Sequence, residues 1–493
     1  EKKYLYKGKS LRLGDIDPSK IEVGNLEVEM QWFTRRSGKV VVAGIDKALT
    51  MMRHCCGYFN GKGKFVNTWN KLEVEAVHDG ATVNYNSDPK VIQPVIRVRG
   101  RYRDFALLET PTLGLLTRSS RVATNVYETL MAARGKPVLF FPARFDLHEV
   151  QAADGYAYNV AVQRFNHDYK LRVGPYISTD AQGDWWGGAG GGTVAHASIA
   201  CFFGDTAETM MAFASVCDPE IPRIALVDFN NDSVGDSILV MQRMFFRYKE
   251  LIELGHESEA KRYNLFGVRL DTSSSIRDIS VPPLGKPELD LGVNPRLVFI
   301  VRNSVDSAWK NWDLPDNWIE RAKKWCANVK IVVSGGFNSA KILNFEKLDV
   351  PVDIYAVGSS LFANDGHRVT DFTADISQVK INGNWQPMSK VGRNKGENPD
   401  LELSDEEREE IRHRFVRLTT FPPIVSEDEI TDSSHTDESI DGSWYQTVEE
   451  FSKWESIVDN WKFGHKDSRI PPSAIVNIDS YTNHILENSF DPS

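Results

Sequence analysis

Two glycine turns carry the strongest chemical signal in the sequence. Residues 330–336 read Lys-Ile-Val-Val-Ser-Gly-Gly and residues 353–359 read Asp-Ile-Tyr-Ala-Val-Gly-Ser, so an apolar strand twice runs into glycine. Glycine lets a backbone approach a ligand and present its N–H groups, and a following helix N-terminus favours an anion. Gly335, Gly336, Gly358 and Ser359 are therefore candidate phosphate ligands, while ordinary βα turns that need glycine for their geometry are the alternative.

Acids end two further apolar runs. Asp228 closes the run 224–228, and Asp271 closes the run 265–271. Arg269 and Asp271 alternate with apolar residues, so both side chains point to one side of the expected strand. Arginine can stack on an aromatic ring or bind a carboxylate. The Asp271 carboxylate can accept hydrogen bonds from sugar hydroxyls or hold Mg²⁺. A structural ion pair is the alternative.

One histidine and one arginine complete the set of candidates. His196 follows the glycines at 190–192, where it could accept a phosphoryl group or act as a general acid or base. A structural hydrogen-bonding role is the alternative for a lone histidine. Arg144 ends the run 137–144 and is a candidate phosphate clamp, with a surface arginine as the alternative.

The elements that would position these residues are short buried strands with helices between several of them. The runs 137–144, 192–196, 224–228, 265–271, 330–336 and 353–359 have the pattern of parallel βα units. A closed or nearly closed βα barrel is the expected arrangement. Before it, strands are expected at 26–33 and 91–99, and a helix at 107–134. Residues 281–318 read as an inserted excursion.

Composition limits the class of partner. The chain has 493 residues and a net charge of −10, so two or three domains are expected. The acidic balance argues against nucleic acid or an anionic membrane as the main partner. The five cysteines form no CxxC pair, which favours a reduced, cytoplasmic protein. The opening residues lack an apolar signal core, and no run reaches the roughly 18 apolar residues of a membrane span.

Taken in order, the motifs resemble nicotinate phosphoribosyltransferase. The resemblance covers roughly residues 25–395 and rests on residues 100–102 with 109–110, 192–196, 227–228, 267–274, 333–336 and 357–359. It implies the type II phosphoribosyltransferase architecture, an irregular βα barrel with an α/β sandwich domain. Residues 1–115 would begin the sandwich, 116–365 form the barrel with the insertion at 281–318, and 366–395 return to the sandwich. Residues 396–493 would be an acidic linker and C-terminal extension.

The resemblance also implies an activity. The family joins nicotinate to phosphoribosyl pyrophosphate, giving nicotinate mononucleotide and pyrophosphate in NAD biosynthesis. ATP is a co-substrate whose hydrolysis is coupled through a phosphorylated histidine, which maps onto His196. Mg²⁺ is the expected metal ion, and a homodimer with a shared active site is the expected assembly.

Roles carry over from the family by position. Arg269 would contact the base, Asp271 the ribose hydroxyls, and Asp228 the ribose, Mg²⁺ and pyrophosphate region. Ser273 would bind substrate beside them. The two glycine turns would hold the 5′-phosphate, and Arg144 would bind phosphate or base.

Two departures keep other functions open. The family's base-stacking tyrosine has no counterpart at residues 14–18, where Tyr4 or Tyr6 is a possible replacement. The base-selectivity segment falls on Ser178, Thr179 and Asp180, and a carboxylate facing the base would repel nicotinate and favour nicotinamide. A nicotinamide phosphoribosyltransferase and a non-catalytic paralogue that binds phosphoribosyl ligands are therefore the alternatives.

Overall fold

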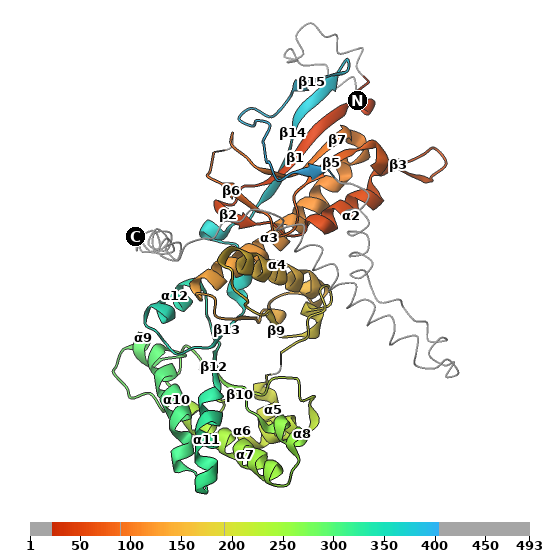
Figure 1. Cartoon of the computed structure of the whole chain (residues 1–493). Coiled ribbons are helices and arrows are strands. Elements are labelled where there is room, and N and C mark those ends of the chain that lie inside the picture. The colour runs from red at the N-terminus through yellow and green to blue at the C-terminus, as the bar shows by residue number, and fades with distance from the viewer. Residues whose placement is uncertain (1–21, 89, 192, 404–493) are drawn as a thin grey trace, which may run out of the picture. The chain divides into compact units, whose positions relative to one another are not determined.

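The computed structural model of the chain describes residues 22–88, 90–191 and 193–403 (Figure 1). Contacts divide the chain into one compact unit of residues 1–165 and 172–424 and a second unit of residues 166–171 and 425–493. Apart from residues 166–169 at the end of one helix, the first unit contains the features below. Of the acidic linker and C-terminal extension expected at 396–493, residues 396–403 are described, and Glu402 and Leu403 pair with Ala76 and Glu75. The rest of that region, Tyr4, Tyr6 and the segment 14–18 lie outside the described residues.

An antiparallel sheet forms the N-terminal part of the first unit. Its strand order is β15-β14-β1-β7-β5-β16. The bounds are β1 (Glu27–Thr34), β5 (Glu73–Ala76), β7 (Pro94–Arg101), β14 (Phe372–Ile381), β15 (Asn384–Pro387) and β16 (Glu402–Leu403). The strands expected at 26–33 and 91–99 are therefore confirmed. β14 pairs with β1, with Val28 opposite Val379, so the chain returns to its first sheet after the barrel.

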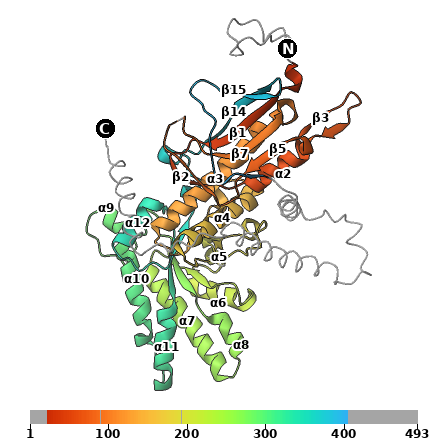
Figure 2. The ribbon, with the colours of Figure 1, turned by 45° about the horizontal axis from the view of Figure 1, so that its top comes forward.

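One face of this sheet is covered by helices. Alternate residues of β1, among them Val28, Met30 and Trp32, are buried in one apolar cluster with residues of α2 (Ile45–Cys55) and α3 (Glu109–Ala132). Figures 1 and 2 show both helices beside the sheet. The expected helix at 107–134 is confirmed as α3. Small two-stranded sheets pair β2 (Gly38–Val41) with β6 (Thr82–Tyr85) and β3 (Gly57–Phe59) with β4 (Phe65–Asn67).

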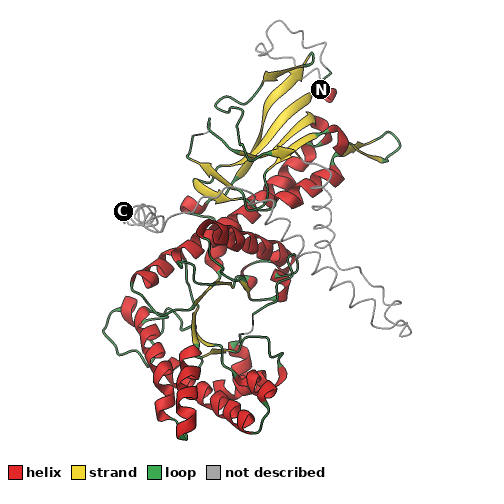
Figure 3. Cartoon of the chain, viewed as in Figure 1, coloured by secondary structure: helices red, strands yellow, loops and turns green. Residues whose placement is uncertain are grey.

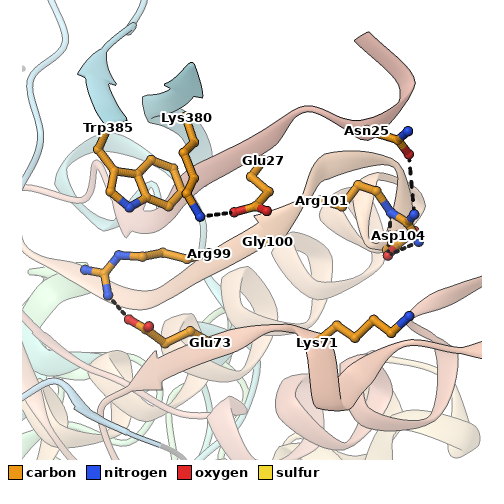
Figure 4. Close-up of a pocket in the computed structure, with 10 residues that line it drawn as sticks. All are labelled: Asn25, Glu27, Lys71, Glu73, Arg99, Gly100, Arg101, Asp104, Lys380 and Trp385. Atoms are coloured by element: carbon orange, nitrogen blue, oxygen red, sulfur yellow. Dashed lines mark hydrogen bonds and ion pairs between the residues drawn. The ribbon is translucent and has the colours of Figure 1, made fainter. Parts of the chain in front are cut away.

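The other face of the sheet is charged. Glu29 is buried there and accepts hydrogen bonds from Ser377 Oγ at 2.6 Å and from Arg99 Nε at 2.7 Å. A cavity of about 470 Å³ opens on this side (Figure 4), but its charged groups are largely paired, as in the 2.7 Å contact of Lys380 with Glu27. Because most of its charges are neutralised in this way, the cavity offers a ligand little net attraction.

A parallel sheet forms the second part, with strand order β10-β11-β12-β13-β8-β9. The bounds are β8 (Val138–Phe140), β9 (Tyr176–Ile177), β10 (Ile224–Leu226), β11 (Gly267–Leu270), β12 (Lys330–Val333) and β13 (Ile354–Val357). The sheet is curled but open, since β9 and β10 end it without pairing to each other (Figure 3). The expected fold class, an irregular βα barrel with an α/β sandwich domain, is confirmed, although the barrel is not closed.

The prediction of a strand at 192–196 is wrong. Gly190 makes a single bridge to Ile177, and His196 begins the short helix α5 (His196–Cys201). Glycines in this stretch pack backbone against backbone: a Cβ on Gly183 would lie 1.7 Å from Gly188 O. The glycine-rich segment before His196 therefore packs as a loop, since glycines weaken a strand.

Helices separate the strands. Their bounds are α4 (Gln151–Tyr169), α6 (Thr206–Val216), α7 (Ser233–Glu253), α8 (Glu257–Ala260), α9 (Pro287–Asp290), α10 (Pro295–Ser307), α11 (Asp316–Asn328) and α12 (Ser339–Lys347). Most of the excursion at 281–318 is helical, and Trp312 stacks on Phe245 of α7 with ring centroids 4.8 Å apart. Within the described ranges, every helix is too short or too polar to cross a membrane.

Candidate active site

The carboxyl ends of neighbouring parallel strands bring the predicted residues together. Leu270 lies opposite Val333, and Val333 lies opposite Tyr355, so the turns after β11, β12 and β13 meet at one edge of the sheet. Ser334 Oγ donates to Asp271 Oδ1 at 2.7 Å, which links the first two turns. Parallel sheets bind ligands at this edge.

Arg269 is the buried cation of this edge. Its side chain is 5% exposed, its Nε has no hydrogen-bond partner among the described residues, and its Cζ lies 5.1 Å from the ring centroid of Phe141. Burial lowers the pKa of the Arg269 guanidinium, and the charges of Asp271 and Asp228 oppose this effect. A buried N–H group without an acceptor is costly, so the unpaired Nε of Arg269 favours a ligand that supplies an acceptor.

His196 and Asp228 form the second pair. His196 Nε2 lies 2.9 Å from Asp228 Oδ1, with the histidine side chain 48% exposed and the aspartate 10% exposed. Burial raises the pKa of Asp228, Asp271 raises it further, and the hydrogen bond from His196 lowers it. When Nε2–H donates this hydrogen bond to the carboxylate, Nδ1 is the ring nitrogen left with a lone pair.

The acids at this edge suit a divalent cation. One atom each of His196, Asp228 and Asp271 lie within 4.8 Å of one another. Mg²⁺ prefers oxygen ligands and often combines one or two carboxylates with phosphate oxygens. Asp271 Oδ1 accepts the hydrogen bond from Ser334, and the second carboxylate oxygen of Asp271 is available for a metal ion. Asp228 and Asp271 therefore fit Mg²⁺ that arrives with a phosphorylated substrate.

The glycine turns have backbones that suit a phosphate. Gly335 and Gly336 have φ of +88° and +68°, backbone angles that residues other than glycine rarely adopt. A Cβ on Gly358 would lie 2.6 Å from Phe145 Cε2, so that glycine permits close packing of the loops after β8 and β13. Ser359 is exposed and begins the short helix η11 (Ser359–Phe362). Ser360 Oγ donates to Phe337 O at 3.0 Å, which ties the two turns together.

Five other predicted residues make their side-chain contacts within their own loops or have none among the described residues. Arg144 is exposed over the ring of Phe145, and Ser273 is exposed with its Oγ 3.0 Å from Ser275 Oγ. Asp180 Oδ1 accepts the N–H of Gly190 at 2.7 Å and so closes its own loop. Ser178 Oγ donates to Gln182, while Thr179 Oγ1 is buried without a partner among the described residues. Within the described ranges, none of these five side chains hydrogen-bonds to His196, Asp228, Arg269 or Asp271.

Two residues of the site were not predicted. Phe141 supplies the ring beneath Arg269, and Ser334 orients Asp271. Ser334 could have been noticed, because a hydroxyl directly before two glycines at a strand end often serves a turn or a ligand. Phe141 could not be noticed from the sequence. It follows β8, whereas Arg269 lies on β11, and β12 and β13 stand between these two strands in the sheet.

Comparisons with known proteins agree with this architecture. Residues 15–120 match the family model described as quinolinate phosphoribosyl transferase, N-terminal domain. The structure is similar to that of nicotinate-nucleotide pyrophosphorylase from Pyrococcus furiosus, with 23% identity over 78% of each chain and a TM-score of 0.52. Human nicotinic acid phosphoribosyltransferase matches with 16% identity over 72% of this chain and 71% of its own, with a TM-score of 0.46. No curated protein matches the sequence.

These findings confirm the resemblance at two levels. The N-terminal part matches a phosphoribosyltransferase domain family, and the fold over most of the chain is that of the Pyrococcus furiosus protein. The fold is therefore the type II phosphoribosyltransferase fold. At 23% identity this likeness shows the fold and leaves the base undecided.

Proposed function

We propose that the protein transfers the phosphoribosyl group of phosphoribosyl pyrophosphate to nicotinate, in NAD biosynthesis. The observation that carries this proposal is the buried guanidinium of Arg269, which lacks a hydrogen-bond acceptor at Nε and lies beside the ring of Phe141. Nicotinate is a flat aromatic ring with a carboxylate, so it offers both a stacking surface and an acceptor. In this proposal Asp271, two residues further along the chain, accepts hydrogen bonds from ribose hydroxyls.

The reaction demands little acid–base chemistry. The ring nitrogen of nicotinate carries a free lone pair and attacks C1 of the ribose while the bond from C1 to pyrophosphate breaks. Positive charge develops on the sugar, and the carboxylates of Asp228 and Asp271 stabilise it. Mg²⁺, held by these acids and the substrate, would neutralise the pyrophosphate oxygens. The chain's main contribution is to hold the two substrates in line.

ATP coupling is proposed at His196. Asp228 holds the Nε2–H, which leaves Nδ1 to attack the terminal phosphate of ATP; the bond from that phosphorus to ADP breaks as the new N–P bond forms. Water later cleaves the N–P bond and releases phosphate. The His196 side chain is half exposed, so a bulky nucleotide can approach the ring.

A homodimer with a shared site is also proposed. Several large apolar side chains are exposed on the turns around the strand ends, among them Phe145, Leu147, Phe203 and Phe229. Apolar groups that gather at the rim of a polar site are typical of a surface that another chain covers. Mg²⁺, ATP and a second subunit thus complete the proposed machinery.

Turnover assays test the proposal. Purified protein is given phosphoribosyl pyrophosphate and Mg²⁺ with nicotinate, nicotinamide or quinolinate, each with and without ATP. We expect nicotinate mononucleotide as the main product, stimulation by ATP, and loss of that stimulation in His196→Ala. Turnover of none of the three bases by the wild type would refute the proposal.

Two alternatives have separate outcomes in the same assays. Preference for nicotinamide would support the alternative suggested by Asp180, and Asp180→Ser should then shift the preference. Calorimetric binding of phosphoribosyl pyrophosphate without any turnover would support a non-catalytic paralogue.

A further inference from the structure

Lys341 lies beside the glycine turn after β12. It belongs to the first turn of α12, where Asn338 Oδ1 accepts its backbone N–H at 2.9 Å. Its Nζ lies 3.4 Å from Gly335 O and 4.1 Å from the ring centroid of Phe337, with Phe345 at 5.8 Å. The side chain thus folds back over two rings toward the turn, and the ammonium group sits where the turn begins.

This ammonium group has no anionic partner among the described residues. Lys330 pairs with Asp353, and Lys136 pairs with Glu346, whereas the contacts of Lys341 are one backbone oxygen and two rings. Burial alone lowers the pKa of Lys341, to about 8. A cation kept out of water without a counter-charge is costly, so an anion at the turn would relieve the cost.

Charged groups on the surrounding elements are engaged elsewhere. On α12, Glu346 accepts hydrogen bonds from Lys136 and from Tyr355 of β13, and on α3 Glu128 pairs with Arg36. Asp271, after β11, accepts from Ser334. On the same elements, Arg121 of α3 and Lys347 of α12 are further cations. No described carboxylate therefore competes with a ligand for Lys341.

We infer that Lys341 binds the phosphate monoester of the phosphoribosyl ligand held at Gly335 and Gly336, and that this binding takes up a proton. The inference rests on the proposed function for the location of the phosphate. Because burial lowers the pKa of Lys341 to about 8, a share of the free protein carries a neutral amine near this pH. The dianionic phosphate favours the ammonium form, so the amine takes a proton from the buffer as the ligand binds.

Calorimetry with ribose 5-phosphate at pH 8 tests the inference. At this pH the phosphate is already a dianion, so the ligand itself exchanges few protons. Titrations in buffers with different heats of ionisation measure the protons taken up. We expect uptake of a measurable fraction of a proton per ligand for the wild type, and none for Lys341→Arg, which stays charged but should bind within about three-fold of the wild type.

Lys341→Met should bind at least about ten-fold more weakly and take up no proton. It should also raise KM for phosphoribosyl pyrophosphate and leave KM for the base unchanged. Lys347→Met, at the exposed far end of the same helix, is the matched control and should behave as the wild type.

The possible results distinguish the role of Lys341 from the proposed phosphoribosyl transfer. Unchanged affinity and proton uptake in Lys341→Met, or no binding of ribose 5-phosphate to the wild type, would overturn the role of Lys341. Wild-type binding with Lys341-dependent proton uptake but no turnover of any base would refute the proposed function and leave the phosphate site intact. Thermal melting of each variant, together with the charge-retaining arginine variant, separates loss of binding from loss of folding.

Discussion

At the scale of single residues, Asp228 connects the two halves of the proposed chemistry. Its carboxylate holds His196 Nε2 at 2.9 Å, and it also lies close enough to Asp271 for their charges to interact. The pair resembles other histidine–carboxylate pairs in which the acid sets the tautomer and orientation of the ring. Asp228 is mostly buried and can fix the orientation of the histidine ring. The ring itself is half exposed, so a nucleotide can reach it.

Asp228→Asn should abolish most ATP stimulation. The amide can present its NH₂ group to Nε2, which favours the tautomer with the proton on Nδ1 and removes the nucleophile. We expect the ATP-dependent rate to fall by about 10²–10⁴-fold, measured together with transfer of labelled phosphate from ATP to the protein. Asp232→Asn is the control, because asparagine at this N-cap of α7 keeps the hydrogen bond to Gly235. Normal labelling in Asp228→Asn would contradict the proposed role.

Much of the residue-level cluster could be predicted from sequence. Arg269 and Asp271 alternate on one strand, and strand ends of a parallel sheet meet at one edge, so local pattern was sufficient for them. Phe141 could not be found in this way, because its contact with Arg269 depends on the order of the strands in the sheet. Lys341 was missed for a related reason, since its turn toward Gly335 depends on how α12 begins.

At the scale of elements, Glu29 joins three strands of the antiparallel sheet. From β1 it accepts hydrogen bonds from Ser377 of β14 and Arg99 of β7, and Lys395 lies 3.4 Å away. Burial raises the pKa of Glu29, but these hydrogen bonds and charges outweigh burial, so the pKa lies below its ordinary value. The carboxylate is therefore a stabilising anion at the centre of the sheet.

Glu29→Gln should destabilise the fold by roughly 2–4 kcal/mol at pH 7. A carboxyl group with a lowered pKa stabilises the folded state above its unfolded pKa, and this stabilisation is lost as the pH falls through the folded pKa. The difference between variant and wild type should therefore shrink at and below about pH 4. Urea unfolding at pH 7 and pH 4 measures it.

Glu27→Gln is the matched control for this experiment. Glu27 lies on the same strand but pairs with Lys380 at a partly exposed position, so its loss should cost less than about 1 kcal/mol. Equal losses for the two variants, or a loss at Glu29 that does not depend on pH, would contradict the account of Glu29.

Prediction of elements succeeded where side chains show a clear period. The strands at 26–33 and 91–99 and the helix at 107–134 have such periods. It failed at 192–196, where only three residues separate the glycines from His196, which begins α5. The two-residue strand β9 is too short to give a pattern at all.

At the scale of the whole molecule, the proposed homodimer accounts for apolar side chains around the site. Phe203, in the turn after α5, is fully exposed at 101% of its reference area, and it precedes Gly204, which lies against Phe229. Phe229 in turn lies near His196, with ring centroids 6.4 Å apart. In the proposed dimer the second subunit would cover this aromatic residue.

Phe203→Asp should disrupt the dimer and lower activity together. Light scattering should give a mass near twice 55.6 kDa for the wild type and near 55.6 kDa for the variant. Leu254→Asp, which changes an exposed leucine at the end of α7, is the control and should keep the dimer. A fully active wild-type monomer would contradict the shared site.

The pairing of β14 with β1 has a consequence for how the protein is made. Val28 leaves the ribosome about 350 residues before its partner Val379, a delay of roughly 20–70 s at ordinary rates of synthesis. During that time one edge of β1 is unpaired, and its backbone N–H and C=O groups can pair with another extended chain. Nascent chains arrested before residue 372 should therefore engage chaperones or be cleaved by proteases near β1. Chains arrested far enough beyond residue 403 to free β14 and β15 from the ribosome should resist both.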